Sequence, residues 1–374
     1  MKVIAFYLPQ FHTTPENDKW WGKGFTEWKN MKSAKPLFNG HYQPRVPLNN
    51  NYYDLSNTET LKWQTKIAKK YGIHGFCCYH YWSAGKMLLQ KPMEMYLNDK
   101  DCDLPFCFSW ANETWTNAWA VGKGAERKVL WKQEYGEEDE WEQHFNYLLP
   151  FFKDSRYMKE DNKPLMVIYR PQYITDLNRR LAYYNRRACE EGFDGMIFAS
   201  QDVSFYLEKD INKTQFKYQI EYQPRYAFYD MSSWIGKKKD ILWAKAQAWV
   251  RDHFRSFRSI KREKLDICSY DDVWHAVLNR KPEVGCIPGA FTDWDNTPRY
   301  KKRGKVLTGA SPDKFRKYFE KQLIRARDEY KSDYIFIFAW NEWCEGGYLE
   351  ADEKYKYGYL EAIKNSLDNF EREW

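Results

Sequence analysis

The feature that most constrains the fold is a series of short apolar runs, rich in β-branched and aromatic residues, that alternate with longer segments of helical periodicity. The predicted strands are 2–8, 73–82, 104–110, 164–170, 195–200, 218–222, 284–291 and 334–340. The predicted helices are 57–71, 137–153, 175–191, 239–258, 311–330 and 356–371. Parallel strands interleaved with helices in this number close into a barrel, so the pattern predicts one α/β domain over residues 1–374, a (β/α)8 TIM barrel.

A doubly wound sheet is the alternative architecture, and two regions depart from a regular barrel. A glycine-rich turn after the first strand would indicate a doubly wound sheet. Gln10, Phe11 and His12 occupy this position instead, which favours the barrel. The first irregular region is a long loop from Gln10 to Asp54, and loops of this length are commonly functional. The second is an insertion at approximately 202–282, which delays the seventh strand and carries a basic helix.

Composition restricts the compartment and the cofactors that we expect. No run approaches the roughly 18 apolar residues of a membrane span, and the segment from Met1 to Pro9 has no small-residue cleavage site of a signal peptide. The eight cysteines form no CxxC pair, and several lie in apolar runs, where cysteine is usually a small buried hydrophobe. We therefore expect a cytoplasmic protein with no metal site and no cofactor.

Aromatic residues make up 19% of the chain, including 18 Trp and 29 Tyr. Rings that carry polar groups pack against sugar C–H bonds and hydrogen-bond sugar hydroxyls, so this abundance favours a carbohydrate cleft over a merely aromatic core. Barrel active sites lie at the C-terminal ends of the strands. From the strand ends and the long first loop we expect these substrate-binding residues: Tyr7, His12, Trp20, Trp21, Glu27, Trp28, Tyr79, Tyr81, Trp82, Trp110, Asn112, Glu113, Trp115, Tyr169, Glu221, Trp294, Asp295, Asn296, Arg299, Trp340, Asn341 and Glu350.

Some members of this set have an alternative structural interpretation. The loop with Asp293, Asp295 and Arg299 can bind hydroxyls or an acidic sugar, but it can equally form Asx turns and an internal salt bridge. Trp119 can extend a subsite wall or simply pack. His80, like His12, can bind sugar or serve as a satisfied structural histidine.

The strongest chemical signal follows the last predicted strand, which ends in two carboxylates flanked by tryptophans and followed by paired glycines. Cleavage of a glycosidic bond uses one carboxylic acid to protonate the leaving oxygen and a second carboxylate as nucleophile or base. Glu342 and Glu345 are three residues apart at a break between strand and helix, so both can face the cleft. Alternatively, they are surface glutamates that stabilise a helix N-terminus. Their spacing alone leaves both interpretations open.

The residues from Asn341 to Gly346 resemble the signature of glycoside hydrolase family 99, whose members are endo-acting α-mannosidases with barrel folds. The chain more closely resembles the WbsX-type, family-99-like proteins of bacterial surface-polysaccharide gene clusters, and the matching stretches occur in the expected order: 5–12, 15–28, 110–116, 294–299 and 338–345. The chain departs from the hydrolases at Cys344, where they carry His, and at Gly347, where they carry Thr.

The resemblance implies a retaining mechanism in which the substrate's own hydroxyl is the nucleophile. Glu342 would deprotonate the sugar 2-hydroxyl, which attacks C1 and gives a 1,2-anhydro sugar. Glu345 would protonate the leaving group and then activate water or another acceptor. These roles follow from the resemblance, because the spacing alone does not assign them.

We therefore expect an enzyme that acts on a glycosidic bond of a cell-surface polysaccharide or of its lipid-linked precursor. The resemblance places it in the biosynthesis of a lipopolysaccharide O-antigen or a capsule, as a glycosyltransferase. One alternative is an endo-acting glycoside hydrolase that degrades a glycan. A second alternative is a non-catalytic glycan-binding protein.

The net charge of the chain is +7, and the excess of positive charge lies in one segment. Residues 236–264 contain ten Lys or Arg and three acids, an excess of seven, so the rest of the chain is balanced. The segment can be a solvated helix face, or it can hold the protein peripherally against an anionic inner-membrane leaflet or a lipid-linked sugar. No nucleic-acid-binding motif accompanies these charges, so we do not expect a nucleic-acid partner.

Overall fold

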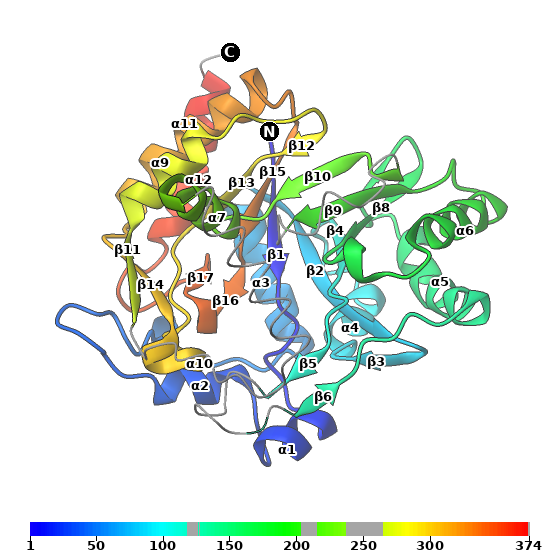
Figure 1. Cartoon of the computed structure of the whole chain (residues 1–374), viewed down its shortest axis with the longest axis horizontal. Coiled ribbons are helices and arrows are strands. Elements are labelled where there is room, and N and C mark those ends of the chain that lie inside the picture. Colours follow the sequence, from blue (N-terminus) through cyan, green and yellow to red (C-terminus); the bar gives the residue numbers. More distant parts are fainter. Residues whose placement is uncertain (118–125, 127, 203–214, 237–264, 373–374) are drawn as a thin grey trace.

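The computed structural model describes residues 1–117, 126, 128–202, 215–236 and 265–372 (Figure 1). Nine parallel strands form its central sheet in the order β12-β10-β9-β8-β4-β2-β1-β15-β13. Their bounds are β1 Lys2–Tyr7, β2 Ile73–Ser83, β4 Phe106–Trp110, β8 Lys163–Ile168, β9 Ile197–Asp202, β10 Tyr218–Glu221, β12 Cys286–Ile287, β13 Gly289–Phe291 and β15 Tyr334–Phe338.

Strands β12 and β13 occupy one position of the barrel. Only Pro288 separates them, and a proline cannot donate to a strand ladder. β12 pairs with β10, whereas β13 pairs with β15, so the interrupted strand joins the two ends of the sheet. The nine strands therefore fill eight positions of a nearly closed barrel, and the predicted (β/α)8 architecture is confirmed.

Helices surround the barrel, with α5 and α6 on one side in Figure 1 and α9, α11 and α12 on the other. All five residues of β4 are buried, as in strands covered on both faces, which explains why the strands read as apolar runs without alternation. Two of the surrounding helices, 58–70 and 312–328, begin with side-chain caps: Asn57 accepts from the Glu59 amide, and Ser311 accepts from the Lys314 amide. The surrounding helices are α3 Thr58–Lys70, α4 Lys91–Asn98, α5 Glu138–Lys153, α6 Leu177–Glu190, α7 Arg225–Gly236, α9 Tyr270–Asn279, α11 Pro312–Asp328 and α12 Gly358–Arg372.

The segments after the strands gather at one end of the barrel, toward which the arrowhead of β1 points (Figure 1). The short elements outside the barrel are α1 Pro15–Trp21, α2 Glu27–Ser33, η1 Leu48–Asn50, β3 Lys86–Leu88, β5 Trp115–Thr116, β6 Val129–Trp131, β7 Lys159–Glu160, η2 Pro171–Tyr173, β11 Asp266–Ser269, α10 Thr297–Tyr300, η5 Lys301–Arg303, β14 Lys305–Thr308, β16 Asn341–Glu342, η6 Trp343–Glu345 and β17 Gly347–Tyr348. Because parallel strands share one C-terminal edge, these loops supply the candidate site.

The long first loop, from Gln10 to Asp54, contains two short helices that the sequence analysis did not predict. It contains α1 and α2, each of only seven residues, too short to show a helical period. The start of α1 is nevertheless encoded locally, because the Thr14 side chain accepts from the Asn17 amide and Pro15 occupies the first turn.

Other expectations concern the insertion, the cysteines and the membrane. The predicted helix 239–258 lies outside the described residues, as does most of the basic 236–264 segment. All eight cysteines are free, and six of them are buried. Within the described ranges, no helix combines the length and the apolarity that crossing a bilayer requires.

Candidate active site

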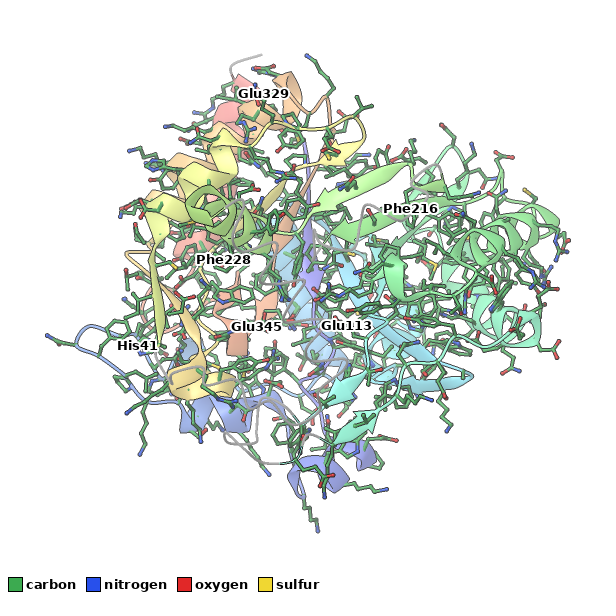
Figure 2. All side chains as sticks on the ribbon, in the orientation of Figure 1. His41, Glu113, Phe216, Phe228, Glu329 and Glu345 are labelled. Atoms are coloured by element: carbon green, nitrogen blue, oxygen red, sulfur yellow. The ribbon has the colours of Figure 1, made fainter. Side chains whose placement is uncertain are left out.

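Arg299 brings three glutamates together at the C-terminal end of the barrel. Its Nη1 lies 2.9 Å from Glu345 Oε1, its Nε lies 3.2 Å from Glu27 Oε2, and its Nη2 lies 3.7 Å from Glu342 Oε2. Glu342 and Glu345 follow β15, Arg299 belongs to α10, and Glu27 begins α2. In Figure 2 the labelled Glu345 lies near the centre of the molecule. The two predicted carboxylates therefore share one arginine.

The turn after Glu345 holds this carboxylate loop against the loop that follows β13. Gly346 has φ 71° and links η6 to β17. A Cβ atom at this glycine would lie 2.6 Å from the Asp295 amide nitrogen, so only glycine fits without a shift. The close approach lets the Asp295 amide donate to the Glu345 carbonyl oxygen at 2.7 Å. The two loops that carry Glu345 and Arg299 are thus fixed to each other.

The two carboxylates have different environments. Glu342 is 6% exposed, and its Oε2 has no hydrogen-bond partner in the described part of the chain. Burial raises the pKa of Glu342 to about 8; the nearby Glu345 charge adds to this effect and Arg299 opposes it. Glu345 instead forms the tightest contact with Arg299, at 2.9 Å. The raised pKa favours the protonated form of Glu342 in the free protein below about pH 8.

Buried phenols form the floor beside the carboxylates. The hydroxyls of Tyr79 and Tyr222 are 3.0 Å apart, and Gln201 Nε2 donates to Tyr79 at 3.3 Å. Tyr169 packs edge-on against both rings. Burial raises the pKa of all three phenols, so they stay protonated and can donate hydrogen bonds to a hydroxylated ligand.

Aromatic rings continue the site away from the carboxylates. The ring of Trp115 lies 5.0 Å from that of Tyr81 and 6.0 Å from that of Trp20, both edge-on. Trp20 and Trp115 are half-buried, so their surfaces remain accessible. The charge of Glu342 raises the pKa of Tyr81, after the larger effect of burial, which places this wall beside the carboxylates. Trp119, expected on the same wall, lies outside the described residues.

A second ion pair borders the site on the side of β4 and β8. Arg170 Nε contacts Glu113 Oε1 at 2.6 Å. Glu113 and Glu345 both influence the Tyr169 hydroxyl, so they lie within electrostatic range of the same ring. Figure 2 shows the labelled Glu113 and Glu345 in the same central part of the molecule. Glu113 is half-buried and accessible to a ligand.

Asp295 supports the site and does not line it. This carboxylate is 0% exposed and accepts hydrogen bonds from His41 at 2.8 Å, from Gln43 at 2.7 Å and from Thr297. Burial acts to raise the pKa of Asp295, but the hydrogen bonds and the nearby Arg45 guanidinium outweigh it and lower the pKa to about 2. The contact with His41 and Gln43 anchors the first loop to the segment that carries Arg299.

Glu350 and Asn341 also lie behind the carboxylates. Glu350 accepts hydrogen bonds from Tyr53 at 2.8 Å, from Gln64 at 2.7 Å and from Trp343 at 2.7 Å. Burial raises the pKa of Glu350 to about 7, and the hydrogen bonds from these donors oppose the rise. Asn341 exchanges hydrogen bonds with both backbone groups of Leu8. Trp343 lies between Glu342 and Glu345 in sequence, so Glu350 orients the segment that carries them.

The other predicted residues contact protein groups in the structure. Neighbouring residues of a barrel strand face its interior and its helices alternately, so every second strand-end residue turns outward. Tyr7 donates a hydrogen bond to Gln64, Trp28 to the Tyr53 carbonyl, Trp82 to Glu140, Trp110 to the Trp82 carbonyl, and Asn112 to the Arg170 carbonyl. Glu221 accepts hydrogen bonds from Arg280 and Tyr330, Asn296 accepts one from the Lys305 amide, and His80 is hydrogen-bonded to His144. The Trp21 ring packs against Phe25, and the Trp294 ring packs against Phe228 and Phe338. His12 and Trp340 are buried at 2% and 0% exposure.

Sequence reasoning did not select four residues that the fold brings to the site. They are Gln201, Tyr222, Arg225 and Tyr300. Gln201 and Tyr222 end strands that the sequence predicted, so the strand-end rule could have included them. Arg225 lies beyond the end of β10, at the start of α7, and no local pattern predicts that a helix start turns back to the cleft.

A (β/α)8 barrel whose strand ends hold a carboxylate pair, an arginine and an accessible aromatic wall has the architecture of a carbohydrate-active enzyme. The family model described as Glycosyltransferase WbsX matches residues 3–363, and the chain belongs to this family. Family and fold together support the class of carbohydrate-active enzymes.

Relatives and solved structures extend this finding. The uncharacterized protein WxcX of Xanthomonas campestris pv. campestris is 32% identical over 371 residues, which are 98% of this chain and 49% of WxcX. The chain thus spans about half the length of the curated relatives it matches. A GH99 endo-alpha-mannosidase from Bacteroides thetaiotaomicron has a TM-score of 0.53 at 12% identity, over 99% of this chain and 97% of that one. A glycoside hydrolase-like protein has a TM-score of 0.55 at 13% identity, over 98% and 93%. At these identities the two structures show the shared fold.

Proposed function

We propose that this protein acts on a glycosidic bond of a cell-surface polysaccharide or of its lipid-linked precursor, through Glu342 and Glu345. The observation that carries the proposal is the carboxylate pair beside Arg299, in which Glu342 is buried and its Oε2 lacks a hydrogen-bond partner among the described residues. A buried oxygen without a partner is costly unless a ligand or a proton occupies it. The accessible rings of Trp20 and Trp115 supply the apolar surface that a sugar needs.

The proposed chemistry uses participation of the sugar 2-hydroxyl. Glu342 takes the hydroxyl proton, the resulting oxygen attacks C1, and the bond between C1 and the leaving oxygen breaks. Glu345 gives its proton to the leaving oxygen. Water or an acceptor hydroxyl, deprotonated by Glu345, then attacks C1 and breaks the bond between C1 and the 2-oxygen. Glu342 returns its proton to that oxygen, and the original configuration at C1 is restored. The step requires one proton in total on the two carboxylates, and the raised pKa of Glu342 supports a proton on the pair near neutral pH.

The position of that proton must change when the glycan binds. In the free protein burial favours the proton on Glu342, whereas the proposed step needs it on Glu345. A sugar hydroxyl that donates to Glu342 Oε2 stabilises the charged form of Glu342. The same substrate displaces water around Glu345 and favours its protonated form. Substrate binding therefore moves the proton between two carboxylates that share Arg299.

Transfer and hydrolysis differ only in the group that opens the anhydro sugar. The name of the WbsX family favours transfer within polysaccharide biosynthesis, whereas the names of the neighbours of known structure favour hydrolysis. We favour transfer, because the family match rests on the sequence of nearly the whole chain and the neighbours share only the fold.

The test uses a fluorescently labelled oligosaccharide of the cell-surface polysaccharide, with and without a lipid-linked donor. We expect Glu342→Gln and Glu345→Gln to lower turnover at least about a hundredfold. Glu361→Gln, which changes an exposed glutamate of α12, is the matched control and leaves turnover unchanged. Elongated products that require the donor identify transfer, and new reducing ends identify hydrolysis. Full turnover in both variants, or glycan binding without any product in the wild type, would refute the assignment.

A further inference from the structure

Arg225 is a cation near the candidate site that no carboxylate of the described residues contacts. It is the first residue of α7, just after β10. Protein surrounds its side chain, yet the residue stays exposed, as expected for a group that lines a depression. Within the described ranges its guanidinium takes part in no hydrogen bond and no ion pair. The two other arginines of the cleft differ in this respect, because Arg299 pairs with glutamates and Arg170 pairs with Glu113.

The packing of α7 places Arg225 on the side of the loop that carries Arg299 and Tyr300. Phe228, one turn after Arg225 in α7, packs edge-on against Trp294 of that loop, and Arg299, the residue before Tyr300, contacts Glu345 at 2.9 Å. The charges of Arg225 and Glu345 both act on the pKa of Tyr169, which follows β8: beside the larger effect of burial, Arg225 lowers this pKa and Glu345 raises it. The same two charges act on the pKa of Tyr300 in α10: beside burial, Glu345 raises this pKa, whereas Arg225, Arg299 and Arg303 lower it. Of the two carboxylates Glu342 and Glu345, it is Glu345 whose charge raises the pKa of Arg225, against the effect of burial. Arg225 and Tyr300 therefore border the region where Glu345 meets its substrate.

The chemistry of these side chains indicates what they can bind. Burial raises the pKa of Tyr300, so its hydroxyl remains a hydrogen-bond donor. An arginine offers a planar set of donors that matches two oxygens of a carboxylate or a phosphate. A neutral sugar hydroxyl needs no full positive charge, and the nearest carboxylates already have cations in contact. A guanidinium that is open to the cleft beside a phenol is thus suited to an oxyanion.

We propose that Arg225 and the hydroxyl of Tyr300 bind an anionic group, a phosphate or a carboxylate, that the substrate carries on the leaving-group side of the scissile bond. The placement on that side rests on the proposed role of Glu345 as the acid of the reaction. A phosphoryl group follows the reducing-end sugar of a lipid-linked glycan, and a carboxylate belongs to a uronic acid. The substrate class is accordingly a charged glycan.

The test measures binding of three probes by isothermal titration calorimetry at low salt: inorganic pyrophosphate, glucuronate and neutral glucose. We expect wild type to prefer at least one anion over glucose, with an affinity that falls as salt is added. Arg225→Gln weakens that anion at least about tenfold, and Arg225→Lys weakens it less because the charge remains. Tyr300→Phe weakens it about threefold. The control Arg186→Gln, at an exposed position of α6, leaves every affinity unchanged.

The outcomes separate this inference from the proposed function. Preference for pyrophosphate assigns the group to a phosphoryl, preference for glucuronate assigns it to a carboxyl, and either result supports the site. Equal anion affinity in wild type and in a folded Arg225→Gln variant overturns it, as does the lack of saturable anion binding. Glu345→Gln removes a nearby negative charge, so it should keep or strengthen anion binding while it abolishes turnover. If that variant still turns over glycan, the proposed function fails while the anion site stands.

Discussion

Arg299 is the residue whose removal tests the electrostatics of the site most directly. Arg299→Gln leaves Glu27, Glu342 and Glu345 around a neutral side chain, in place of contacts of 3.2, 3.7 and 2.9 Å. Breaking a buried ion pair costs about 3–5 kcal/mol, because a desolvated charge is left without its partner. We expect this loss in the free energy of unfolding at pH 8. At pH 5 protonation relieves the repulsion among the carboxylates, so the loss should shrink to about 1 kcal/mol.

The sign of this pH dependence follows from the proton uptake of the variant. Without Arg299 the folded state binds protons more tightly than the unfolded state, so its stability is retained at low pH and lost as pH rises. Urea unfolding at pH 5 and pH 8 measures the difference. Adding Glu27→Gln should recover part of the loss at pH 8. Arg186→Gln removes an exposed pair with Glu190 and should cost less than about 1 kcal/mol at both pH values. A loss in Arg299→Gln that is equal at the two pH values would refute the reasoning.

Three further predictions concern protonation and support of the site. First, kcat/KM should fall as pH rises through about 8, because Glu342 then loses the proton that substrate binding is proposed to move to Glu345; a profile that stays flat to pH 10 contradicts that proton transfer. Second, Glu350→Gln should lower kcat at least about tenfold with little change in KM, because it disturbs the hydrogen bonds that orient Trp343; a change in KM alone would indicate a substrate contact instead. Third, Asp295→Asn should lower the free energy of unfolding by about 2 kcal/mol at pH 7, since the pKa of Asp295 is about 2 and lies below its ordinary value. That stabilisation is present above the ordinary pKa and is lost as pH falls through about 2, so the difference should disappear in acid unfolding curves.

The barrel could be predicted from sequence because each strand is buried on both faces. Continuous apolar runs such as 334–340 record that burial directly, and the helices between them are long enough to show a period. The break at Pro288 was hidden, because β12 and β13 read as one run, 284–291. Short elements were also hidden. α1 has a clear cap at Thr14, but its seven residues give no periodic signal.

Residues of the candidate site could be predicted from the sequence only where an unusual residue type follows a predicted strand. Glu342 and Glu345 stand out because a carboxylate pair at a strand end is rare among apolar neighbours. Tryptophans near the strand ends gave a weaker signal, because Trp28 and Trp110 use their indole N–H groups to brace backbone carbonyls. A sequence cannot show which face of a strand end turns inward, and the placement of Arg225 depends on the path of α7 in three dimensions.

The two departures from the hydrolase pattern lie behind the reacting carboxylates. Cys344 is 1% exposed, and its Sγ donates to the Glu27 carbonyl at 3.4 Å, so it contacts the segment that brings Glu27 to Arg299. At Gly347 a Cβ atom would lie 2.3 Å from the ring of Phe338, which fills the space that a larger residue would need. Phe338 in turn packs edge-on against Tyr222, a phenol of the cleft floor. The two substitutions therefore act on the supports of Glu27 and Tyr222, and they leave the carboxylate pair intact.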